Sequence, residues 1–231
     1  MNTRTRFIGT GLLIAACAIA FAAQDAITLK FAPKEGTILN YKMNASIDAG
    51  GATVTVAANV TNKVTKVDAN GYTIAATQSN LKINFNGQEM DQPDSSDTTT
   101  YKSNGEVVEV TAEQTSDSTY RVAELTNFVY PDKAVKVGDT WTYKVQPDDK
   151  KGLVAATADY KVDSTEKIGT HDTFKIKLTY KEDGASGAES DGYVWIDTTD
   201  GSMVKSTSTW TNVPLGPGGG VNGTVTVERA D

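Results

Sequence analysis

The 231-residue chain contains one cysteine, one histidine and three tryptophans. The single cysteine, Cys17, leaves no intramolecular disulfide, and a chain of this length can bury a core without one. The single histidine, His171, would have to serve any serine triad or histidine-based zinc site, and we expect it in an exposed turn. The motifs G-x-S-x-G, H-E-x-x-H and G-x-x-x-x-G-K are absent. We therefore assign no catalytic residue, no metal ligand and no cofactor.

Acidic residues gather in two segments that read as loops, and their carboxylates are the remaining candidates for metal ligands. One group is Asp91, Asp94 and Asp97, and the other is Asp183, Glu189 and Asp191. Neither group has the spacing of a calcium-binding loop. We interpret both as solvated surface charge.

Clusters of basic residues are also lacking, and the formal net charge is −7. Without Arg4 and Arg6, which lie in the N-terminal segment, 20 basic residues face 29 acidic ones and the charge becomes −9. Binding to nucleic acid depends on basic clusters that neutralise phosphate, so nucleic acid is excluded as a partner.

One long apolar run is present, and it lies at the N-terminus. It extends from Phe7 to Phe21 behind Arg4 and Arg6, and it ends in the small-residue pattern Ala20-Phe21-Ala22. This arrangement predicts a signal peptide over residues 1–22, cleavage before Ala23 and an exported, periplasmic or extracellular protein with no transmembrane span after cleavage.

A second interpretation of the same segment is lipidation. Ile14-Ala15-Ala16 precedes Cys17 and resembles the site at which bacterial lipoproteins are cut and acylated. The apolar run continues beyond Cys17, where such sequences usually become polar, so we prefer simple cleavage and keep a membrane-anchored lipoprotein as the alternative.

The remainder alternates apolar and polar residues with the period of a β-strand. In residues 37–47 the odd positions from Leu39 to Ile47 are apolar, and similar runs recur to the end of the chain. Pairs such as Asn70-Gly71, Asn86-Gly87 and Asp200-Gly201 separate the runs and predict hairpins. We expect roughly eleven to thirteen strands and at most one short helix, over residues 118–128.

An internal duplication organises these strands. Residues 34–43 align with residues 136–145, with Lys, Gly, Tyr and Lys identical. We predict a single β domain over residues 23–231, built from two repeats, about 27–110 and 136–229, joined by 111–135. The fold class is all-β, with two tandem antiparallel units forming one curved sheet or half-barrel, and a β-sandwich is the runner-up.

The segment Pro131-Asp132-Lys133-Ala134-Val135-Lys136-Val137-Gly138-Asp139-Thr140-Trp141, with the strand Gly192 to Asp197, resembles an uncharacterised family of secreted bacterial β-rich proteins. More distantly, the layout is similar to the half-barrel of outer-membrane lipoprotein carriers. The first resemblance implies a fold and an envelope location. The second implies a curved sheet that cups an acyl chain.

These observations favour a non-catalytic protein of the cell envelope that binds an apolar, lipid-like ligand or an envelope protein on a concave sheet face. Small and aromatic residues of that face are the candidate ligand-binding set: Ala58, Ala156, Ala158, Tyr160 and Trp195. A structural or interaction module of the cell surface is the alternative, and a carbohydrate-active enzyme or glycan-binding domain is third.

Overall fold

The computed structural model describes residues 25–48, 51–112, 115–116, 118–215 and 219–230. The predicted cleavage site and Cys17 lie outside these residues. Within them the chain forms twelve strands and one helix: β1 (Ile38–Asp48), β2 (Thr53–Val67), β3 (Gly71–Phe85), β4 (Gln88–Gln92), β5 (Ser95–Lys102), β6 (Val107–Ala112), α1 (Thr119–Thr126), β7 (Thr140–Val145), β8 (Ala156–Ile168), β9 (His171–Glu182), β10 (Glu189–Asp197), β11 (Met203–Val213) and β12 (Val221–Arg229).

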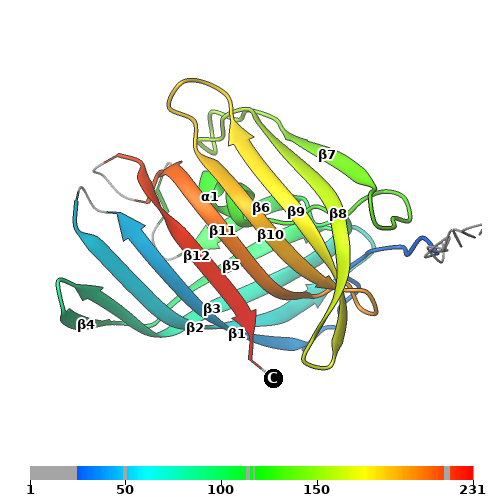
Figure 1. Ribbon diagram of the computed structural model, residues 1–231, viewed down its shortest axis with the longest axis horizontal. Helices are drawn as coiled ribbons and strands as arrows, with labels where there is room; N and C mark the ends of the chain where they lie inside the picture. The colour runs from blue at the N-terminus through cyan, green and yellow to red at the C-terminus, as the bar shows by residue number, and fades with distance from the viewer. Residues whose placement is uncertain (1–24, 49–50, 113–114, 117, 216–218, 231) are drawn as a thin grey trace, which may run out of the picture.

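All twelve strands belong to one antiparallel sheet, which confirms the all-β prediction. The order is β6-β5-β3-β2-β1-β12-β11-β10-β9-β8-β7, with β4 paired to the C-terminal end of β3. The sheet curves around α1 and does not close, so β6 and β7 remain as free edges (Figure 1). It is therefore an open curved sheet and not a two-sheet sandwich.

The two halves of the sheet use the same strand order and the same entry turn. β1-β2-β3-β5-β6 and β7-β8-β9-β10-β11 are both chains of neighbouring antiparallel strands. Gly36, with φ of 85°, donates its N–H to the carbonyl of Val64 at 2.8 Å, and Gly138, with φ of 95°, donates to Val162 at 2.8 Å. Positive φ is readily available to glycine, which explains its place in both turns.

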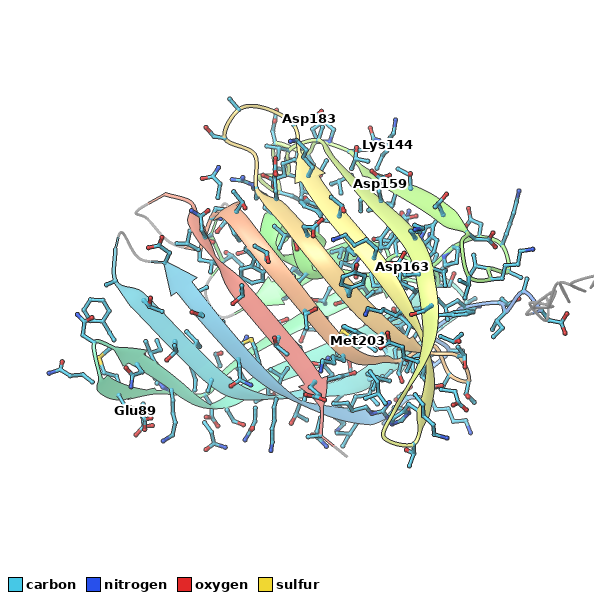
Figure 2. The ribbon with its side chains drawn as sticks, viewed as in Figure 1. Glu89, Lys144, Asp159, Asp163, Asp183 and Met203 are labelled. Atoms are coloured by element: carbon cyan, nitrogen blue, oxygen red, sulfur yellow. The ribbon has the colours of Figure 1, made fainter. Side chains whose placement is uncertain are left out.

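The alternation predicted from the sequence separates the two faces of the sheet. The concave face carries most of the core, including Tyr41, Phe174 and Ile176 together with Leu125 of α1. Charged side chains, among them Glu89 and Asp159, lie on the outer face (Figure 2). The predicted helix at 118–128 is confirmed as α1, and Asn127 ends it with an extended backbone.

Candidate functional site

Four of the five predicted ligand-binding residues lie on the concave face, but they are buried there. Ala58, Ala156, Ala158 and Tyr160 are between 3% and 5% exposed. The ring of Tyr160 stacks on Trp141 with centroids 4.9 Å apart, and its hydroxyl accepts the backbone N–H of Val129 at 3.2 Å. Three of these residues, all in β8, are thus part of the packed core beneath the segment that follows α1.

Trp195 lies on the opposite face, so its expected place on the concave face is wrong. In β10 the core residues are Val194 and Ile196, and Trp195 alternates with them. Its indole N–H donates to Glu166 at 2.7 Å, and the ammonium of Lys175 lies 5.2 Å from its ring centroid. The aliphatic stems of lysine side chains can bury an aromatic ring on an outer face, which explains why Trp195 is only 8% exposed.

Helix α1 is fixed to both halves of the sheet. Arg121 forms a two-point ion pair with Glu182 of β9, with distances of 2.8 and 2.5 Å. The Tyr120 hydroxyl accepts the backbone N–H of Val110 on the edge strand β6 at 3.2 Å. Lys151, from the β7–β8 connection, donates to the carbonyl of Val108 on β6 at 2.9 Å. These contacts bridge the gap between β6 and β7, which we call the seam.

Away from α1, the concave side of β1 to β4 is apolar and incompletely covered. Its side chains are half-buried or exposed, and Phe85 and Met90 are 40% and 47% exposed. The strand registers place on this face, named here the open apolar face, Met43, Ala45, Ile47, Val54, Val56, Leu81, Ile83, Phe85 and Met90. The adjoining concave positions Gly223, Gln88 and Gln92 are uncharged. An uncovered apolar surface on the concave side is typical of a binding surface.

A cavity of about 580 Å³ opens at the seam between β6, α1 and the β7–β8 hairpin. We call it the seam cavity, and its lining mixes charges of both signs with apolar walls. The lining residues are Glu106, Val107, Glu124, Tyr143, Lys144, Val145, Gln146, Pro147, Asp148, Asp149, Lys150, Lys151 and Leu153. Its volume lies in the range of sites for small molecules.

Glu124 of α1 is the least solvated acidic group of the seam cavity. It is 6% exposed, and its Oε2 atom has no hydrogen-bond partner within the described part of the chain. Burial raises the pKa of Glu124 to about 7, the nearby Glu106 raises it too, and Lys151 opposes the shift. The pKa of Tyr143 is also raised, mainly by burial and to a smaller extent by the charge of Glu124. A buried acid with a perturbed pKa in a cavity is a candidate functional group.

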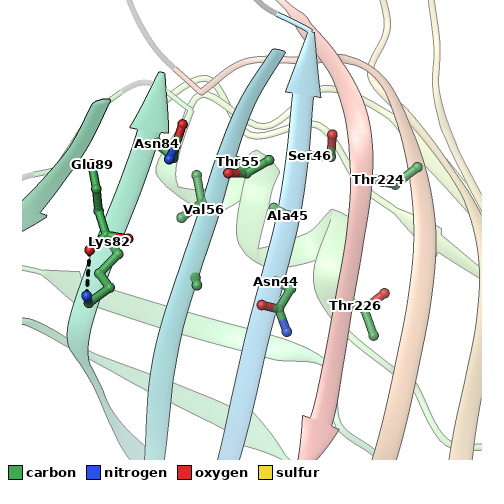
Figure 3. A pocket seen from close by; sticks show the side chains of 11 residues that line it. Asn44, Ala45, Ser46, Thr55, Val56, Lys82, Asn84, Glu89, Thr224 and Thr226 are labelled. Atoms are coloured by element: carbon green, nitrogen blue, oxygen red, sulfur yellow. Dashed lines mark hydrogen bonds and ion pairs between the residues drawn. The ribbon is translucent and has the colours of Figure 1, made fainter. Parts of the chain in front are cut away.

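A second hollow, of about 420 Å³, lies on the outer face across β12, β1, β2, β3 and β4. Figure 3 shows short hydroxyl and amide side chains in front of the strands, with α1 behind the sheet. The charged residues of its lining, Lys82 and Glu89, form an ion pair at 2.6 Å. The lining is therefore polar, in contrast to the open apolar face on the other side of the same strands.

His171 is not the exposed turn residue expected from the sequence. It begins β9, its side chain is 17% exposed, and its Nδ1 atom lies 2.6 Å from Oδ2 of Asp197. Burial opposes ionisation of Asp197, but hydrogen bonds from Thr199 and His171 outweigh it and lower the pKa of Asp197. The pair ties the start of β9 to the end of β10.

Two features are absent from the described ranges, a cluster of metal-ligating side chains and a helix that could span a membrane. No group of three or more His, Cys, Asp or Glu side chains is arranged to hold a metal ion among the residues that the structure describes. The acidic residues of one expected loop are instead ion-paired, Glu189 with Lys181 and Asp191 with Lys177. In the same part of the chain, no helix has the length and apolarity needed to cross a bilayer.

Comparison with known proteins gives two distant structural similarities. No family model and no curated protein matches the sequence. A protein from Bacteroides fragilis, assigned as exported and with a YmcC-like fold, is 13% identical, with a TM-score of 0.38 over 89% of this chain and 99% of that chain. A DUF1329 family protein from Desulfovibrio piger is 13% identical, with a TM-score of 0.24 over 85% of each chain.

Proposed function

We propose that the protein is exported and acts, without catalysis, by binding an apolar ligand such as an acyl chain on the open apolar face. The observation that carries the proposal is the exposure of Phe85 and Met90 within the open apolar face, whose side chains carry no charge. Burying such a surface against an aliphatic chain would yield about 25 cal/mol for each Å² removed from water.

The concave setting favours a slender ligand over a folded partner. The face spans four neighbouring strands, a width of about 14 Å at the usual strand spacing, and the sheet curves around it (Figure 1). A flexible aliphatic chain can follow a curved surface of this width, whereas a globular domain would need to match its curvature. The narrow, curved face therefore favours an apolar ligand over the protein partner that the sequence left open.

Binding can be tested with the fluorescent apolar probe N-phenyl-1-naphthylamine. We expect its fluorescence to rise with the wild-type protein and dodecanoate to displace it. Phe85→Glu and Met90→Glu, at exposed positions of the face, should weaken probe binding at least tenfold because the carboxylate would lose its hydration. Thr55→Glu, on the outer face of β2, is the matched control and should bind the probe as the wild type does.

The outcomes separate the candidate functions. Absence of probe binding by the folded wild-type protein would overturn the ligand proposal and favour the interaction module. Equal weakening by Thr55→Glu would show that the effect is one of charge and not of the face.

Export is tested separately. We expect cell fractionation to place the protein outside the cytoplasm, and the intact mass of the exported protein to correspond to a chain that begins at Ala23. A mass that includes acyl groups on Cys17 would instead identify a lipoprotein.

A further inference from the structure

The seam cavity is a second candidate site, distinct from the open apolar face in place and in chemistry. The open apolar face lies on β1 to β4 and is uncharged, whereas the seam cavity lies between β6, α1 and the β7–β8 hairpin. Four acidic side chains and three lysines contribute to its lining. Ligand binding at the seam cavity can therefore be tested independently of binding at the open apolar face.

Glu124 indicates that the seam cavity accommodates a hydrogen-bond donor. Glu124 is one of the lining residues of the cavity, and it is 6% exposed. Its Oε2 atom lacks a partner among the described residues. A buried polar atom without a partner costs free energy, and a ligand that donates a hydrogen bond there would remove this cost.

The mixed lining narrows the chemistry of that ligand. An anion would meet the four carboxyl groups, and a cation would meet the three lysine ammonium groups. A hydroxyl group carries no charge, and it donates to carboxylates while it accepts from ammonium and phenol groups. The ring of Tyr143 and the side chains of Val107 and Leu153 provide apolar contacts beside these polar groups. This combination fits a sugar ring, which has hydroxyl edges and an apolar face.

We propose that the seam cavity binds a neutral polyhydroxylated group, with Glu124 accepting a hydrogen bond from one of its hydroxyls. Two sources share this chemistry, a free sugar and the sugar head group of a lipid. The volume of about 580 Å³ is sufficient for a small ligand of either kind.

Isothermal titration calorimetry with four probes tests the proposal. Methyl β-glucoside represents the free sugar and octyl β-glucoside the lipid head group, while octylammonium and octanoate carry the same alkyl chain with a charge of either sign. In the Phe85→Glu variant, whose open apolar face should no longer accept an alkyl chain, we expect octyl β-glucoside, below its micellar concentration, to bind at least tenfold more tightly than both ions. Comparable binding of methyl β-glucoside would identify free sugar as the source, and its failure to bind would identify the lipid head group.

Variants locate the interaction. Glu124→Leu removes the acceptor without leaving a buried charge, and we expect it to weaken glucoside binding about tenfold or more, the effect of losing one hydrogen bond to a charged group. Glu124→Gln keeps an acceptor of the same shape and should bind nearly as the wild type does. Glu109→Leu changes an exposed residue of β6 outside the cavity and serves as the matched control.

Three results would overturn the proposal: no binding of either glucoside, equal binding of an ion, or unchanged binding by Glu124→Leu. Phe85→Glu distinguishes this site from the proposed function. That variant should lose the apolar probe and retain the glucoside, and loss of glucoside binding there would place the glucoside on the open apolar face and refute the seam site.

Discussion

Replacing Glu124 with glutamine should change how the stability of the protein depends on pH. Burial raises the pKa of this carboxyl from 4.5 to about 7, with Glu106 acting in the same direction and Lys151 opposing it. The folded protein thus holds the proton more tightly than the unfolded chain does. Each unit of difference between the folded and unfolded pKa corresponds to about 1.4 kcal/mol in the free energy of unfolding, so this shift amounts to roughly 3 kcal/mol.

The sign of the effect follows from the two pKa values. Below pH 4.5 the carboxyl is protonated in both states, and the protonated form makes its full contribution to the stability of the folded protein. As the pH rises towards 7, the unfolded chain loses the proton first and the wild type is destabilised. Above pH 7 both states are ionised and the loss is complete. Glu124→Gln cannot ionise, so it should equal the wild type at pH 4 and exceed it by roughly 3 kcal/mol at pH 8.5.

Urea denaturation followed by circular dichroism at pH 4, 5.5, 7 and 8.5 measures both proteins. Only the difference between them is interpreted, because carboxyl groups distant from residue 124 titrate equally in both. Glu109→Gln, at an exposed position of β6, should show no such divergence from the wild type. A difference between Glu124→Gln and the wild type that stays constant over this range would refute the argument.

Three further changes test the packing. Arg121→Met should cost about 3–5 kcal/mol in the free energy of unfolding, because it leaves the buried Glu182 without its partner, and adding Glu182→Met should restore part of the loss. Gly201→Ala should be far more destabilising than Gly36→Ala, because a Cβ at Gly201 would lie 2.2 Å from a backbone carbonyl oxygen, whereas a Cβ at Gly36 would meet open space. Both glycines have positive φ, so each variant also carries a backbone strain of about 1–2 kcal/mol. Ala156→Trp should overpack the core and cost about 1–3 kcal/mol, visible as a lower urea midpoint, and an unchanged midpoint would mean that the position is not packed.

The sequence was sufficient for the strands and turns because both depend on local patterns. Alternating residues such as Leu39 and Tyr41 identify β1, and Asn86-Gly87 joins β3 to β4. The division into repeats stays a prediction, which a superposition of residues 34–110 on 136–210 would test. Pairing between strands that are distant in the sequence depends on tertiary contacts. No local sequence pattern therefore indicates that β1 lies next to β12.

The candidate site was harder to predict, for two physical reasons. β10 reads Tyr193-Val194-Trp195-Ile196, with large apolar groups on both faces, so alternation alone does not assign Trp195 to a side. Val56 and Ala58 alternate in the same way, yet α1 and the segment after it bury only part of the concave face and leave the open apolar face uncovered. Glu124 stands alone in a short helix without a spacing motif, and its importance arises only from burial.

The pairing of β1 with β12 has a consequence for the kinetics of folding. Tyr41 lies opposite Arg229, so the centre of the sheet is closed by residues almost 190 positions apart. Each half can form from local hairpins, but the two halves join only when the last strand is present, and contacts of such sequence separation slow folding. Until then β1 presents an unpaired edge that can recruit strands from other chains. A chaperone that shields this edge during synthesis would act on the first half of the protein, before its C-terminus is made.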